Sequence, residues 1–236
     1  MWPDYFKRRK SSLRYLPKSV TWAYLRLFHN RAAITLIPTG DVNALLQRKG
    51  FKRTVVWSRG VDLDVFCPDN PFDYRSINLS GIIALYVGRV SDEKSVDVFC
   101  KMDIPVNKVV IGKGDALEEL REQYPKVTFL GEITDRRLLA RYMAGADVFV
   151  FPSLTDTFGL VTIEAMACGT PVAASVNAAG MASLITNHVN GYTDVDLTTA
   201  VAQCLNMGKL PSIRESIANR SWQRPAEELL GHFTPI

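Results

Sequence analysis

Residues 147–174 read DVFVFPSLTDTFGLVTIEAMACGTPVAA, and this stretch decides the fold. The run 147–151 is aromatic and β-branched, as a buried parallel strand requires, and Pro152 ends it. Polar turn and N-cap chemistry is then supplied by Ser153, Thr155, Asp156 and Thr157. Residues 160–168 are typical of a helix that Gly169 stops before the next strand. A strand–loop–helix–strand unit of this kind predicts a parallel sheet. It also directs the free N–H groups of the helix start toward a ligand.

Two carboxylates, Asp156 and Glu164, lie eight positions apart across this loop and helix. Glu164 falls about one turn inside the predicted helix, so it can point back to the crevice that Asp156 borders. An Asp and a Glu taken at random are more often a helix cap and a solvated helix residue. Gly159 lets a ligand approach the backbone closely, and the whole pattern therefore favours a nucleotide-sugar site.

A second apolar strand, 82–87, runs into Gly88 and Arg89 and then reaches Lys94. Arg89 and Lys94 can converge on one pyrophosphate, the arginine through its planar fork and the lysine as a point charge. As charge builds on a departing nucleoside diphosphate, the two cations stabilise it and can replace a metal ion. An isolated pair of this kind is ordinarily a solvated surface pair.

Together, the two segments resemble the retaining glycosyltransferases of family four, which have the double-Rossmann GT-B architecture. Asp156 and Glu164 match that family's two glutamates separated by seven residues, with an aspartate in the first place, and Ser95 replaces the glycine that usually follows the lysine. Mannosyltransferase-like and sulfoquinovosyltransferase-like members carry the same Thr-Asp-Thr-Phe-Gly. The resemblance implies a hexosyltransferase that moves a hexose, mannose being one candidate, from a nucleotide-diphosphate sugar to a glycan or lipid acceptor. It implies retention and no metal or other cofactor.

The resemblance also implies roles for single residues. Arg89 and Lys94 would be the catalytic cations on the diphosphate, and Glu164 would accept hydrogen bonds from the ribose. The donor sugar would be held by Asp156, Thr157, Phe158, Gly159 and Leu160. The nucleotide would be bordered by Gly88, Gly112, Phe129, Leu130 and Gly131. Glycine-ended strands near 108–112 and 126–131 complete a β-α-β-α-β-α-β-α-β order, the sequence sign of a doubly wound parallel α/β sheet.

Three segments follow from this resemblance. Residues 1–57 would be the remnant of a truncated amino-terminal acceptor domain, 58–210 the complete Rossmann-like donor domain, and 211–236 the closing carboxy-terminal helices. Because most of the acceptor domain would be missing, the alternative is a catalytically inactive module that binds nucleotide sugars or assembles with a partner. Two strands alone cannot bury both faces of the remnant, so we expect the isolated chain to self-associate, to adhere to membranes, or to require a partner that carries an acceptor domain.

Charge and composition limit the remaining partners. Residues 1–60 carry 13 Lys and Arg against 2 Asp and Glu, a net charge of +11, whereas the rest carries −7. Basic residues 7–18 lie among aromatic ones, which suits peripheral contact with an anionic membrane, although a solvated face is an equal alternative. We expect no nucleic acid as a partner, because no recognised module accompanies the charge. Four cysteines without short spacings, and no long apolar run or secretory signal, favour the cytoplasm.

Other motifs are given structural interpretations. The Asp-x-Asp pairs at 62–64 and 194–196 are expected to form turns and caps, with Asp196 as the N-cap of a helix at 197–205, so no metal is assigned. The partial Gly-x-Gly at 112–114 lacks a third small residue and is weak support for a dinucleotide site. The three histidines show no metal-ligand spacing.

Overall fold

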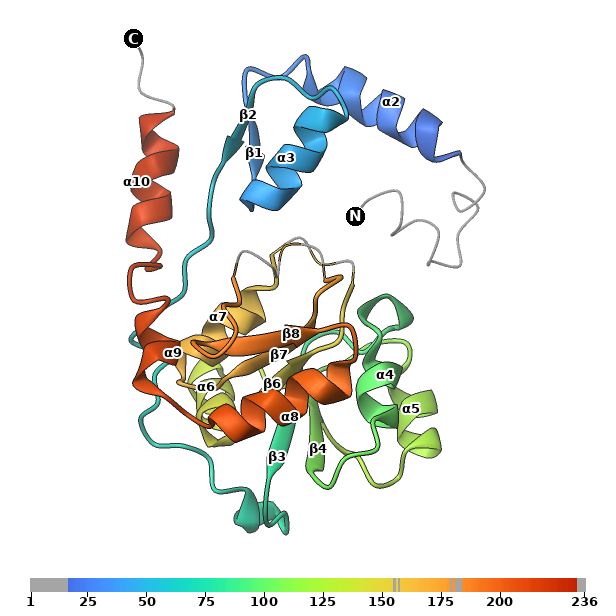
Figure 1. Cartoon of the computed structure of the whole chain (residues 1–236), viewed down its shortest axis with the longest axis vertical. Coiled ribbons are helices and arrows are strands. Elements are labelled where there is room, and N and C mark those ends of the chain that lie inside the picture. Colours follow the sequence, from blue (N-terminus) through green and yellow to red (C-terminus); the bar gives the residue numbers. More distant parts are fainter. Residues whose placement is uncertain (1–16, 155, 157, 179, 181–183, 233–236) are drawn as a thin grey trace.

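The computed structural model describes residues 17–232, except 155, 157, 179 and 181–183. Two parallel sheets organise this part of the chain, one with two strands and one with six. Figure 1 shows the small sheet with its two helices above the large one, and a carboxy-terminal helix that rises from the larger body beside the smaller. Of the predicted basic membrane contact at 7–18, residues 7–16 lie outside the described residues.

The large sheet has the strand order β5-β4-β3-β6-β7-β8, and every pairing in it is parallel. This is the doubly wound order, so the predicted fold class is confirmed. The strands are β3 (Ile83–Val87), β4 (Asn107–Ile111), β5 (Thr128–Gly131), β6 (Val148–Phe151), β7 (Val172–Ser175) and β8 (Gly191–Asp194). The last strand was not predicted, because its sequence GYTD is short and polar and only its pairing with β7 defines it.

Both faces of the large sheet are covered. All residues of β3, β6 and β7 are buried, as expected for central parallel strands with helices on each side. Alternate residues point to opposite faces, so Leu85 and Phe149 join one apolar cluster and Tyr86 and Val148 join the other. The first cluster contains residues of α6 (Arg136–Gly145), α7 (Leu160–Ala167) and α9 (Pro211–Glu215). The second contains residues of α4 (Val96–Lys101), α5 (Leu117–Gln123) and α8 (Leu197–Met207).

Side-chain caps fix two of these helices. The Asp135 carboxylate accepts the N–H groups of Arg137 and Leu138 and begins α6. The Asp196 carboxylate accepts two N–H groups at the start of α8, as predicted from the second Asp-x-Asp pair. These acids therefore replace the hydrogen bonds that the first turn of a helix lacks.

The small sheet consists of two parallel strands with two helices. Its elements are α2 (Lys18–His29), β1 (Thr35–Ile37), α3 (Gly40–Arg48) and β2 (Thr54–Val56). No residue of α2 is buried, and the side chains of Tyr24 and Phe28 are 67% and 63% exposed. An aromatic groove of about 480 Å³, lined in part by Trp22, Phe28 and Phe51, lies between α2, β1 and α3. The apolar face of this small body is therefore largely open.

Two connecting segments, near residues 57–61 and 219–223, run alongside each other. They join the small body, which contains the two-stranded sheet, to the large body, which contains the six-stranded sheet. The Val61 N–H donates to the Arg220 carbonyl at 2.8 Å, and the Trp57 indole N–H donates to the Pro225 carbonyl at 2.7 Å. A Cβ on Gly60 would lie 2.5 Å from the Trp222 Cα, so only glycine permits the crossing. The second segment continues into α10 (Gln223–Gly231), which Figure 1 shows beside β2.

Candidate donor site

A cleft of about 590 Å³ lies at the carboxyl ends of β3 and β6. These neighbouring strands lead into connections on opposite sides of the sheet, and ligands of doubly wound folds bind at that position. The cleft brings together seven of the predicted site residues: Gly88, Arg89, Lys94, Asp156, Phe158, Gly159 and Leu160. Thr157, also predicted, lies outside the described residues.

An ion pair joins the two loops that form the cleft. The Lys94 Nζ lies 2.5 Å from an Asp156 carboxylate oxygen, and the two side chains are only 22% and 24% exposed. Lys94 ends a short 3-10 helix (Asp92–Lys94), and Ser95 follows it with a φ of 53°. That left-handed conformation accounts for the glycine found at this place in similar sequences, and Ser95 adopts it here at some conformational cost.

Arg89 is held by its own loop and remains accessible. Its Nη1 donates to Glu93 at 2.8 Å, and its side chain is 60% exposed. The Arg89 carbonyl accepts the Tyr86 hydroxyl at 2.8 Å, and Tyr86 itself is buried in β3. Burial raises the pKa of Tyr86, with the Asp156 charge adding to the effect, so the phenol stays a protonated donor that fixes the turn.

The loop after β6 delivers the start of α7 to the cleft. Gly159 is the N-cap, with a φ of 65°, and the Thr162 hydroxyl donates to its carbonyl at 2.6 Å. The polar side chains at 153–157 were expected to supply N-cap chemistry, but the cap is Gly159, for which no side-chain cap exists. Leu160 and Val161 line the cleft, and the first two N–H groups of a helix have no acceptor within it, whereas the Thr162 N–H donates to the Gly159 carbonyl at 2.9 Å. The loop therefore presents hydrogen-bond donors beside Asp156.

Glu164 lies on α7 but is not among the residues that line this cleft. Burial raises the pKa of its carboxyl group, and the nearby Arg136 guanidinium offsets part of that effect. Arg136 begins α6, directly after the end of β5. Glu164 therefore lies near the start of α6.

The predicted nucleotide residues gather at the ends of β3, β4 and β5. The Gly88 N–H donates to Ile111 O at 3.0 Å, and the Gly112 N–H donates to Gly131 O at 2.7 Å. A Cβ on Gly112, whose φ is +146°, would lie 1.8 Å from the Gly88 carbonyl oxygen, so the strands approach more closely than any other residue allows. Phe129 and Leu130 are half-buried in β5. Of the whole group, only Gly88 lines the cleft.

Arg59 is a cleft residue that the sequence analysis did not assign. It lies on the first connecting segment, lines the cleft, and places its guanidinium 4.6 Å from the centre of the Trp57 ring. No carboxylate of the described residues lies within ion-pair distance of it. The sequence around Arg59, a lone arginine before a glycine, does not indicate a site. Arg59 reaches the cleft because two distant segments of the chain come together next to it.

The first Asp-x-Asp pair also has a structural role. The Asp62 carboxylate accepts the Val65 N–H at 3.2 Å and lies 3.5 Å from Arg136. In the part of the chain that the structure describes, no three His, Cys, Asp or Glu side chains gather as metal ligands. Within the same residues, no helix has the length and apolarity of a membrane span.

Comparisons with known proteins show which sequences this chain resembles. The family model described as "Glycosyl transferases group 1" matches residues 81–207. "GDP-mannose-dependent alpha-mannosyltransferase" of Mycobacterium tuberculosis is 33% identical over 228 residues, which cover 91% of this chain and 60% of that protein. "Sulfoquinovosyl transferase SQD2" of Arabidopsis thaliana is 32% identical over 185 residues, which cover 73% of this chain and 36% of that protein. The chain thus spans 60% or less of these two relatives.

A solved structure supports the fold independently. Anabaena Alr3699/HepE, in complex with UDP and glucose, superposes with a TM-score of 0.78 over 93% of this chain and 68% of its own. Its sequence is only 18% identical, so the likeness concerns the fold.

Proposed function

Because the chain belongs to the glycosyl transferases group 1 family, we propose that it binds a nucleotide-diphosphate sugar and transfers the hexose to a glycan or lipid acceptor. The observation that carries this proposal is the cleft at the β3–β6 switch point, where cations of one loop meet the carboxylate and helix start of another. The mycobacterial relative is named for GDP-mannose, and the Anabaena protein holds UDP. Both names support a nucleotide-sugar donor.

The diphosphate would lie between the two loops. Arg89 and Lys94 would contact its oxygens, with Lys94 exchanging its Asp156 partner for phosphate. Arg59 would add a third cation from the connecting segment. Asp156 is then free to accept hydrogen bonds from sugar hydroxyls, and the first N–H groups of α7 can donate to the same sugar. Glu164, near the start of α6, would accept the ribose hydroxyls.

The chemistry follows from the charges. The bond between the anomeric carbon and the diphosphate oxygen breaks, and its electron pair leaves with the nucleoside diphosphate. The acceptor oxygen forms the new bond on the same face of the sugar, and its proton passes to the leaving diphosphate. Cations placed around the diphosphate stabilise the developing charge in the transition state more than the ground state, which lowers the barrier. They occupy the role that a divalent metal would otherwise have, so the proposed transfer needs no metal.

One observation favours a second candidate, a module that binds the donor without transferring it. Among the residues that the structure describes, the small sheet has two strands, and the chain spans 60% of the length of its mycobacterial relative. Transfer requires an acceptor held in line with the donor, which binding does not. An intact donor cleft without transfer would therefore serve as a sensor or an assembly element.

Calorimetry followed by transfer assays separates the two candidates. Titration with UDP-, GDP- and ADP-sugars, each with and without EDTA, should show saturable binding of at least one donor, unchanged by the chelator. Transfer to glycan and lipid acceptors then identifies the enzyme, and binding without transfer identifies the module. Failure of every donor to bind would reject both, and a strict requirement for Mg²⁺ or Mn²⁺ would reject the metal-free mechanism.

A further inference from the structure

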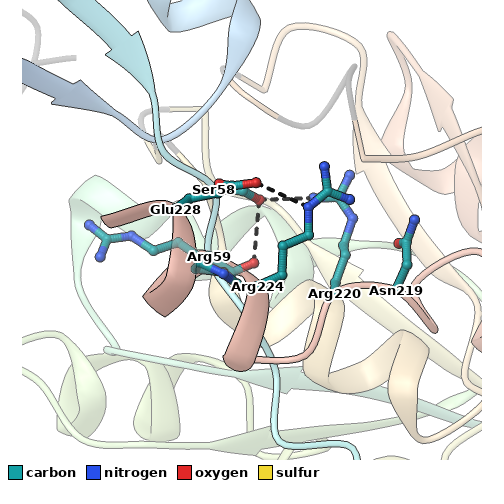
Figure 2. A pocket seen from close by; sticks show the side chains of 7 residues that line it. Ser58, Arg59, Asn219, Arg220, Arg224 and Glu228 are labelled. Carbon is teal, nitrogen blue, oxygen red and sulfur yellow. Dashed lines mark hydrogen bonds and ion pairs between the residues drawn. The ribbon is translucent and has the colours of Figure 1, made fainter. Parts of the chain in front are cut away.

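A second cavity lies at the crossing of the two connecting segments (Figure 2). It has a volume of about 190 Å³ and takes its walls from both segments and from α10. Its lining residues are Ser58, Arg59, Asn219, Arg220, Arg224, Pro225 and Glu228. Only Arg59 is shared with the donor cleft, and Figure 2 shows its side chain pointing away from the other two arginines. The cavity is therefore separate from the proposed donor site.

Arg220 is the central charge of this cavity. Its Nη1 donates to the Ser58 hydroxyl at 3.3 Å, and no described carboxylate lies within ion-pair distance of it. Its guanidinium lies beside that of Arg224, whose Nε is bonded to Glu228 at 3.0 Å (Figure 2). Burial and the neighbouring Arg224 charge both lower the pKa of Arg220. A cation that is partly desolvated and faces a like charge gains most from a bound anion.

We propose that this cavity binds a compact oxyanion, with phosphate as the representative, between Arg220 and Arg224. Guanidinium groups match phosphate oxygens through paired N–H donors, and two of them converge here. The Asn219 amide adds a neutral donor on the same walls, whereas the Ser58 hydroxyl donates to the Arg59 carbonyl at 3.4 Å. Glu228 balances Arg224, so Arg220 remains as an uncompensated positive charge beside the bound anion, and Arg59 adds another at the edge of the cavity.

The position of the site gives the anion a mechanical effect. Ser58 belongs to the first connecting segment, whereas Arg220 belongs to the second. An oxyanion bound to both would add a charged link to the Val61–Arg220 backbone bond and the Trp57–Pro225 bond. It would therefore stiffen the junction between the small and large bodies. This inference is independent of the proposed transfer reaction.

Hydrogen–deuterium exchange of the full-length chain tests the site. Arg89→Ala and Lys94→Ala would be combined as the background, which removes two of the three cations proposed to bind diphosphate in the donor cleft. Sodium phosphate, added at constant ionic strength against chloride, should slow exchange at residues 57–61 and 219–228 in a saturable way. Arg220→Gln should weaken this response about tenfold or more, since it removes a charge-assisted contact.

Matched variants make the outcome decisive. Arg224→Gln provides a second test at an exposed position if Arg220→Gln fails to fold. Arg121→Gln, which removes an exposed arginine paired to Glu118 on α5, should leave the response unchanged. A parallel series with phosphatidic acid vesicles distinguishes a lipid headgroup from free phosphate as the source. The proposal is overturned if neither source slows exchange at these residues, or if Arg220→Gln and Arg224→Gln respond like the background protein.

Discussion

The ribose-binding role proposed for Glu164 would come with a cost to stability. Burial raises the pKa of its carboxyl group, so the folded chain holds the proton more tightly than the unfolded chain. Its contribution to stability is therefore complete below the ordinary range of a glutamate and is lost as the pH rises through the elevated pKa. The proposed contact with ribose hydroxyls is strongest for the ionised group, which is the form that burial disfavours. Such a conflict is common where a polar group is kept for ligand binding.

Glu164→Gln should separate these two effects. The amide has nearly the same shape and no charge, so the melting temperature at pH 7 should rise and its decline between acidic and neutral pH should become smaller. Nucleotide-sugar affinity should fall by about 1.5–3 kcal/mol, because a charged acceptor is replaced by a neutral one. Thermal melts across pH and calorimetry measure both, with the exposed Glu119→Gln as the control. A variant with unchanged affinity would remove Glu164 from the site.

Arg89 and Lys94 should act on phosphate and not on the nucleoside. Arg89→Ala and Lys94→Ala are each expected to weaken diphosphate-nucleotide binding about tenfold to a hundredfold, and to leave nucleoside binding nearly unchanged. Lys113→Ala is the matched control, since Lys113 is paired to Glu132 and does not line the cleft. Equal losses for nucleotide and nucleoside would show that the cations support the fold instead.

At the scale of elements, the Lys94–Asp156 ion pair connects the loop after β3 to the loop after β6. Both side chains are mostly shielded, so the pair should couple the stability of the two loops more than an exposed pair does. A double-mutant cycle with Lys94→Ala and Asp156→Ala should give a coupling of about 0.5–3 kcal/mol in the free energy of unfolding. The same cycle on Arg75 and Asp73, an exposed pair, should give a smaller coupling, because solvent screens the two charges. Equal couplings would mean that the loops are not joined in solution.

The close approach of β3 and β4 makes a second prediction about elements. Gly112→Ala should lower the free energy of unfolding by about 3 kcal/mol or more, because the new Cβ would overlap the Gly88 carbonyl and the backbone would be strained. Gly40→Ala, at the start of α3, meets no atom within 4 Å and should change stability by less than about 1 kcal/mol. Chemical denaturation measures both. Similar values for the two variants would contradict the packing of these strands.

Elements that carry local signals were predictable from the sequence, and those defined by distant partners were not. Three kinds of element are predicted by a few neighbouring residues, and the structure confirms them. These are the strand at 147–151, the helix cap at Asp196, and the turns at the glycines after β3 and β4. β8 needs β7 beside it, and Arg59 reaches the cleft only because two distant segments cross at Gly60. The prediction that a polar side chain caps α7 was wrong, because the helix begins at Gly159 through its backbone conformation.

For the whole molecule, the small body determines the solution behaviour. Its sheet has two strands, and α2 exposes a row of apolar side chains that includes Tyr24, Leu27 and Phe28. Unpaired strand edges and a continuous apolar face favour association with other chains. By contrast, the exposed apolar Val195 of the large body lies in a connection between β8 and α8.

We therefore expect the purified chain to self-associate through α2 and to show little transfer on its own, because two strands offer little surface to hold an acceptor in line with the donor. Light scattering should give a mass above 26.3 kDa that increases with concentration. Leu27→Lys together with Phe28→Lys should shift the protein toward monomer, since two charges would have to be buried in the contact. Val195→Lys, at 77% exposure, should not change the mass. A monodisperse monomer that transfers hexose at ordinary enzyme rates would contradict both parts of this expectation.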